Sequence, residues 1–162
     1  MRIDSSRSET ELRPIKARQG LLNRAHGSAR FSFGDSSCLC AVFEDNSESI
    51  TSTFHPLQKP LIDPLSQSMI KECVLHFCRS SFVHVITQVM HDNGSILSAA
   101  FNSAIFALID AGLSLTSSQL SWLFAGIPLI DHGGSATCVV NTKGEFVLDP
   151  TLAEEKVLKY SF

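Results

Sequence analysis

Residues 82–112 read FVHVITQVMHDNGSILSAAFNSAIFALIDAG, and this stretch decides the fold. Its beginning, Phe82 to Met90, is rich in valine, isoleucine and threonine, a composition that favours a β-strand. Apolar side chains fall on both of its faces, which is typical of a strand that is covered on both sides. We therefore expect a central strand here, buried on both faces.

A turn and a helix follow this strand. Turn-forming residues fill His91 to Gly94, and Ser95 can cap the helix after it. The apolar positions of the helix recur with a period of 3.6 residues and are Leu97, Ala100, Phe101, Ala104, Ile105 and Leu108. Gly112 supplies the C-terminal stop.

On the N-terminal side, the sequence predicts a β-hairpin and a third strand. Ala29 to Phe33 alternates with a period of two, and Cys38 to Phe43 is a nearly continuous apolar run. Gly34 to Ser37 forms the turn between them. The third strand covers Ile50 to Phe54 and ends before Pro56.

A first helix is expected from Pro64 to about Arg79, because proline suits the first helical turn. Its apolar stripe, which should face the sheet, consists of Leu65, Met69, Ile70, Cys73, Val74 and Phe77. After the second helix we expect short strands near residues 121–128, 136–140 and 145–148, the last two joined by residues 141–144. We also expect residues 153–162 to form the beginning of a further helix. The class is therefore α+β, with helices packed on a mixed sheet.

Length and composition indicate one globular domain. The chain has 162 residues, of which 44% are hydrophobic and 18% charged. Residues 1–11 have the composition of a disordered tail, so we expect the domain to span residues 12–162. The longest apolar run is interrupted well short of the roughly 20 residues that cross a bilayer. The polar N-terminus lacks the apolar core of a secretory signal, so we expect a soluble protein inside the cell.

The cysteines and the charges define what the chain can bind. The five cysteines lack the paired spacing of a zinc site, so we expect buried free thiols and no metal at Cys38, Cys40, Cys73, Cys78 and Cys138.

The formal net charge of -3 excludes a global basic field. Basic residues nevertheless crowd the first 30 positions, at Arg2, Arg7, Arg13, Lys16, Arg18, Arg24 and Arg30. This segment either meets phosphate or an acidic partner, or is a solvated face.

Three segments resemble the ribonuclease PH family as it occurs in the eukaryotic exosome ring. Residues 19–35, QGLLNRAHGSARFSFGD, are similar to the opening hairpin of the family. Residues 92–112, DNGSILSAAFNSAIFALIDAG, match its loop and helix, and residues 144–155 contain its LDPT motif at 148–151. The resemblance implies a ribosomal protein S5 domain 2-like fold, a mixed sheet with helices on one face. Relative to the family, the loop after Phe43 is short and the C-terminus is short or truncated.

The resemblance also implies where chemistry would reside. Active members carry an arginine in a G-G-T-R-T turn before the second helix, where it holds phosphate. Here the matching residues are Gly94, Ser95 and Ile96, followed by another aliphatic residue, so the phosphate loop is predicted to be degenerate. Asp149 and Glu155 lie near the acidic positions of the family. They are degenerate catalytic candidates, and a turn and a helix start explain them more simply.

The family therefore implies a non-catalytic subunit of the exosome ring, without a cofactor. Its partners would be other ribonuclease PH-like subunits in a hetero-hexameric ring, S1/KH cap subunits and RNA, in the nucleus, the nucleolus and the cytoplasm. Two alternatives stay open: an active phosphate-dependent 3′-to-5′ exoribonuclease, and an RNA-binding module. The candidates for contact with RNA or a partner are Arg13, Arg18, Arg24 and Arg30. Exposed or hydrogen-bonded histidines, rather than catalytic ones, are expected at His26, His76, His84 and His91.

Overall fold

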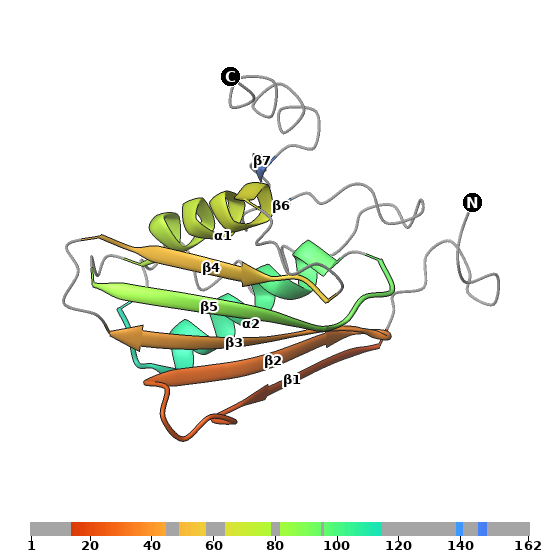
Figure 1. The fold of residues 1–162 in the computed structure, drawn as a ribbon, viewed down its shortest axis with the longest axis horizontal. Coiled ribbons are helices and arrows are strands. Elements are labelled where there is room, and N and C mark those ends of the chain that lie inside the picture. Colours follow the sequence, from red (N-terminus) through yellow and green to blue (C-terminus); the bar gives the residue numbers. More distant parts are fainter. Residues whose placement is uncertain are drawn as a thin grey trace.

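A computed structural model shows a mixed five-stranded sheet with two helices packed against it (Figure 1). It describes residues 14–44, 49–57, 64–78, 82–94, 96–114, 139–140 and 146–148. The strands of the sheet are β1 (Ile15–Gln19), β2 (Gly27–Phe33), β3 (Ser36–Glu44), β4 (Thr51–His55) and β5 (Val83–His91). The helices are α1 (Pro64–Phe77) and α2 (Ile96–Asp110).

The strand order is β1-β2-β3-β5-β4. Adjacent strands are antiparallel except β4 and β5, which run parallel because α1 connects them. The expected mixed sheet is therefore confirmed. A separate antiparallel pair, β6 (Val139–Val140) and β7 (Phe146–Leu148), matches two of the short strands predicted near the C-terminus. The strand predicted at residues 121–128, the helix at 153–162 and the tail at 1–11 lie outside the described residues.

The predicted hairpin is confirmed and is longer than expected. Strand β2 begins at Gly27 and β3 at Ser36, so only Gly34 and Asp35 remain as the turn. Gly34 has a φ of 59°, a left-handed conformation that glycine adopts without a steric penalty. Strand β1, which pairs with β2 from Ile15 to Gln19, was not predicted from the sequence.

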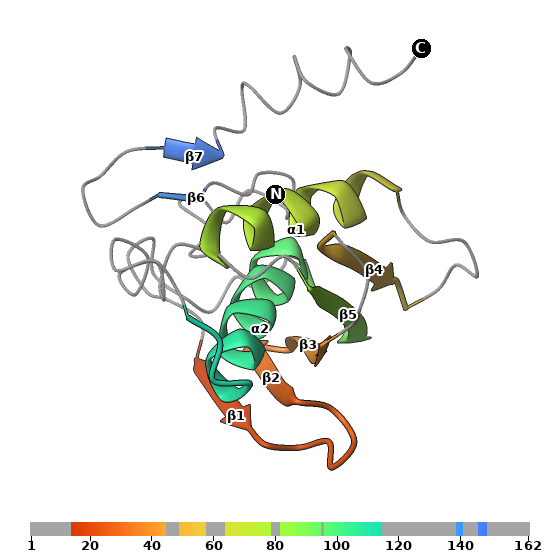
Figure 2. The same ribbon diagram turned by 90° about the vertical axis from the view of Figure 1, so that its left-hand side faces the viewer.

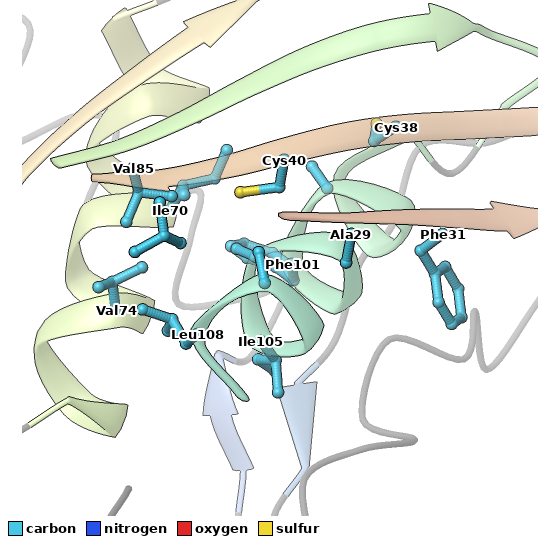
Figure 3. Close-up of a cluster of buried hydrophobic side chains, with 14 of the residues drawn as sticks. Ala29, Phe31, Cys38, Cys40, Ile70, Val74, Val85, Phe101, Ile105 and Leu108 are labelled. Atoms are coloured by element: carbon cyan, nitrogen blue, oxygen red, sulfur yellow. The ribbon is translucent and has the colours of Figure 1, made fainter. Parts of the chain in front are cut away.

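Both helices cover the same face of the sheet, and the core lies between the helices and this face (Figure 2). Figure 3 shows Ile70 and Val74 of α1 and Phe101 of α2 close to Cys40 and Val85 of the sheet. The predicted stripe of α1 is confirmed at Met69, Ile70 and Val74, and its other members lie outside the residues whose side chains are described. The helix ends at Phe77, two residues before the predicted end.

The prediction that the fifth strand is buried on both faces is wrong. Every second residue of β5 is buried from Val83 to Val89, and the residues between them are half-buried. The reason is that both helices pack on one face, so the opposite face, which we call the open face, has no helix of the described ranges on it. The interior position of β5, between β3 and β4, is as expected.

Within the described ranges, no helix is both long and apolar enough to cross a membrane. The expectation of buried free thiols is confirmed for Cys38, Cys40 and Cys78, and the other two cysteines lie outside the residues whose side chains are described.

The buried thiol of Cys40 should make the chain less stable in alkaline solution. Burial raises the pKa of Cys40 from its ordinary value of 9.0 to about 12, although a hydrogen bond from Thr87 acts in the opposite direction. Above about pH 9 the unfolded chain therefore releases a proton that the folded chain keeps, so the free energy of unfolding should fall as pH rises, by up to about 1.4 kcal/mol per pH unit.

The measurement is urea unfolding between about pH 7.5 and about pH 10.5 for the native sequence and for Cys40→Ala. We expect a shallower decline in the variant, because it has no thiol to ionise at this position. Burial also raises the pKa of Cys38, so some decline should remain. Equal slopes in the two proteins would show that Cys40 does not contribute.

Candidate functional site

The turn before α2 is fastened to the sheet by Ser36, the first residue of β3. The Ser36 hydroxyl donates a hydrogen bond to the Gly94 carbonyl oxygen at 2.7 Å and accepts one from the Asn93 amide at 2.9 Å. The Gly94 amide donates to Oδ1 of Asp92 at 3.1 Å. The turn, which contains part of the predicted degenerate phosphate loop, is therefore held by hydrogen bonds at Asn93 and Gly94. Ser95 lies outside the described residues.

The start of α2 carries no cation that could hold phosphate. Ile96 is half-buried and packs against the core, and its carbonyl oxygen accepts a hydrogen bond from the Cys38 thiol at 3.7 Å. Residues 92–99, DNGSILSA, contain neither lysine nor arginine. An aliphatic side chain donates no hydrogen bond, so this loop cannot clamp phosphate with an arginine fork.

Basic side chains gather instead on the open face of the sheet. Arg18 of β1 lies directly opposite Arg30 of β2, and Lys16 lies opposite Ser32. Side chains alternate between the two faces of a strand, and Ala29, Phe31 and Phe33 of β2 fill the core. Because the core takes the odd-numbered residues of β2, Arg30 and Ser32 point to the open face together with Lys16 and Arg18.

These residues line a cavity of about 550 Å³, which we call the basic pocket. Its β1 and β2 side consists of Lys16, Arg18, Arg30 and Ser32. Its other side consists of Gly34, Asp35, Ser37 and His91, from the hairpin turn, β3 and the end of β5. The pocket thus joins residues that lie far apart in the sequence.

Ser37 connects the two sides of the basic pocket. Arg30 Nη2 donates a hydrogen bond to the Ser37 hydroxyl oxygen at 3.2 Å, and Nδ1 of His91 lies 3.5 Å from the same oxygen. Nε of Arg30 is buried and has no hydrogen-bond partner within the described part of the chain. Asp35 is the single carboxylate among the lining residues that the structure describes, and its Oδ2 lies 3.5 Å from the side-chain nitrogen of Asn93. The lining therefore has an excess of hydrogen-bond donors and of positive charge.

The structure brings together two of the four arginines predicted to contact RNA or a partner, Arg18 and Arg30. Arg24 is exposed in the loop between β1 and β2 and does not line the basic pocket. Arg13, Asp149 and Glu155 lie outside the described residues, so their predicted roles stay predictions.

The histidines behave largely as expected. His26 is exposed, and its Nδ1 accepts a hydrogen bond from the Glu44 amide at 3.1 Å. His84 is hydrogen-bonded to the Thr53 hydroxyl at 3.1 Å. His91 is exposed and lines the basic pocket, a position that the sequence alone did not indicate. The side chain of His76 lies outside the described ones.

Comparison with known proteins establishes the family. Residues 11–59 match the model of the 3′ exoribonuclease family, domain 1. The chain is 31% identical over 175 residues to the exosome complex exonuclease RRP46 homolog of Arabidopsis thaliana, which covers 96% of this chain and 67% of that protein. It is 32% identical over 170 residues to the homolog of Oryza sativa subsp. japonica, covering 94% and 66%. The chain therefore belongs to the ribonuclease PH family of 3′ exoribonucleases, as its resemblance predicted.

Solved structures share this fold. The crystal structure of rice Rrp46 superposes with a TM-score of 0.63 at 29% identity, over 68% of this chain and 60% of that one. A chain of an archaeal exosome core superposes with a TM-score of 0.53 at 17% identity, over 64% and 51%, which is a likeness of fold alone. The chain spans about two thirds of the length of the two plant relatives.

Proposed function

We propose that this chain is a non-catalytic ring subunit of an RNA exosome. The observation that carries the proposal is its similarity, over nearly its whole length, to two plant proteins named exosome complex exonuclease RRP46 homologs. In this role it contacts other ribonuclease PH-like subunits in a hetero-hexameric ring. Its further partners are S1/KH cap subunits and RNA. It supports 3′-to-5′ RNA processing and degradation, including rRNA processing and mRNA decay, in the nucleus, the nucleolus and the cytoplasm.

The start of α2 supports the absence of catalysis. Phosphorolysis needs a clamp for inorganic phosphate beside the 3′ end of the RNA, and charged forks provide most of that clamp. At the start of α2, the half-buried Ile96 packs against the core, and no arginine or lysine occurs in residues 92–99. No arginine or lysine of residues 92–99 is therefore available to hold phosphate for the candidate catalytic carboxylates Asp149 and Glu155.

Affinity purification of the tagged chain from its own cells, with mass spectrometry of the bound proteins, tests the ring role. We expect several other ribonuclease PH-like subunits and S1/KH proteins to co-purify in similar amounts. An untagged culture is the control. Recovery of the tagged chain alone, at the size of a monomer, would contradict the proposal.

A second assay separates the scaffold from the active enzyme. The purified chain is incubated with single-stranded RNA with and without inorganic phosphate, and release of nucleoside diphosphates is measured. We expect no phosphate-dependent release. Release that disappears in Asp149→Asn or Glu155→Gln would instead show that this chain is a phosphate-dependent 3′-to-5′ exoribonuclease.

A further inference from the structure

We propose that the basic pocket on the open face of the sheet binds a phosphate group. The inference goes beyond the ring role and does not depend on it, because the pocket is formed within this one chain. The pocket borders the turn before α2 at Asp35 and His91. Its basic side chains lie on the open face of the sheet, whereas α2 packs on the opposite face.

The first argument is the placement of like charges. Arg18 and Arg30 face each other across β1 and β2, and Lys16 lies two residues before Arg18 on the same face. Like charges directly opposite each other on neighbouring strands are destabilising. Within the described residues, none of these three side chains has a carboxylate partner in a salt bridge, and Asp35 is the one acid of the lining. An anion bound between them would relieve this repulsion.

The second argument is the hydrogen-bonding capacity of the lining. Arg18 and Arg30 provide planar forks of N–H donors, which match the oxygens of phosphate. Nε of Arg30 is buried without a partner in the described structure, so the described protein groups do not satisfy every donor of this guanidinium. Ser32 and Ser37 add hydroxyl groups, and His91 adds a ring nitrogen.

The third argument is the way in which the pocket is held rigid. Ser36 and Ser37 are adjacent in β3, beside an irregularity in the pairing of β3 with β5 at Ser37 and Cys38. The Ser36 hydroxyl holds the turn before α2, whereas the Ser37 hydroxyl contacts Arg30 and His91 in the pocket. Arg30 is therefore positioned before any ligand arrives, and preorganised donors bind anions more tightly than mobile ones.

The chemistry of the lining selects phosphate rather than a nucleobase. Among the described residues of the lining, the His91 imidazole is the one ring on which a base could stack, and the stems of the lysine and arginines are the one aliphatic surface. The volume of about 550 Å³ is within the range of ligand pockets and exceeds the size of one phosphate. Free phosphate and a phosphodiester of an RNA strand are both compatible with this shared chemistry.

Isothermal titration calorimetry of the full chain with inorganic phosphate, in a phosphate-free buffer, tests the inference. We expect the native sequence to bind. Arg18→Gln and Arg30→Lys should each weaken binding about tenfold, the first by removing a charge and the second by keeping the charge but losing the fork. Arg18 is exposed on the edge strand, so its replacement should leave the fold intact, and a thermal melt of each variant verifies this.

Lys71→Gln is the matched control, because it also removes one positive charge but lies on α1, against the other face of the sheet. It should change phosphate binding by less than about twofold, since a distant charge on the other side of the sheet acts only through a screened field. No binding of phosphate by the folded native chain, or an equal loss in Lys71→Gln, would overturn the proposal.

Fluorescence anisotropy with a labelled single-stranded RNA identifies the source of the phosphate. An RNA strand in the pocket should be displaced by inorganic phosphate and should bind less tightly to Arg18→Gln. In that variant, the slope of the logarithm of the RNA-binding constant against the logarithm of the salt concentration should also be smaller by about one. Binding of phosphate without RNA indicates the free anion. A glutamate-rich peptide that binds where phosphate does not would overturn the assignment in favour of an acidic protein partner.

Discussion

Gly27→Ala should lose more than about 3 kcal/mol of unfolding free energy, because it inserts a methyl group where two backbones meet. Gly27 is the first residue of β2, and the end of α2 crosses directly above it. A Cβ at this position would overlap the carbonyl oxygen of Ala107, the amide nitrogen of Ala111 and the Cβ of Ala111. Backbone atoms cannot rotate away as a side chain does, so α2 would have to lift from the sheet.

Gly112→Ala is the control for this prediction, because no atom lies within 4 Å of the Cβ that it would add. Gly112 has a φ of 69°, so this replacement costs only the strain of a left-handed conformation, roughly 1–2 kcal/mol. Urea unfolding of the three proteins compares the two effects. Equal destabilisation by the two replacements would show that β2 and α2 are farther apart than in this structure.

The elements that hold the core were predictable from the sequence because burial imposes a period on them. Residues 96–110 show the helical period, and the alternation of Ala29 to Phe33 fixes the hairpin. The composition of Val83 to His91 predicted a strand but not which of its faces is covered, since Ile86 and Val85 are equally apolar. Which face of β5 is covered depends on the placement of both helices on one side of the sheet.

Strand β1 was not predictable for a related reason. All five of its residues are exposed, so neither an apolar face nor a buried run marks it. Its existence depends on pairing with β2, from Ile15 opposite Phe33 to Gln19 opposite Ala29. Pairing of this kind is a long-range property that a local pattern does not contain.

The same limit applies to the basic pocket. Charge alone singled out Arg18 and Arg30, but the pairing of β1 with β2 sets them opposite each other. His91 and Ser37 are 54 residues apart in the sequence and meet only because β3 pairs with β5. Their residue types carried no signal for this meeting, since histidine at a turn and serine at the start of a strand are common.

Asp110→Ala should destabilise the chain by about 2–3 kcal/mol, because one carboxylate holds the β1–β2 connection on the end of α2. Oδ2 of Asp110 accepts a hydrogen bond from the Ser28 amide at 2.9 Å and from the Gly20 amide at 3.2 Å. Ser28 is 1% exposed, so its amide would lose its partner in a place with little access to water. Hydrogen bonds to a charged acceptor contribute more than neutral ones.

Asp110→Asn separates the charge from the geometry, because it keeps one carbonyl oxygen in nearly the same place. We expect it to lose about half as much as Asp110→Ala in urea unfolding, and to retain hydrogen-exchange protection at the Ser28 amide that Asp110→Ala loses. The Ser28 hydroxyl accepts hydrogen bonds from the amides of Leu21 and Leu22, both at 2.9 Å, so loosening Ser28 should also release this connection and the Arg24 that it carries. Unchanged protection at Ser28 in Asp110→Ala would mean that another group holds the loop. In that case, the side chain of Gln19, which donates a hydrogen bond to the Phe106 carbonyl oxygen at 2.8 Å, becomes the principal tie between β1 and α2.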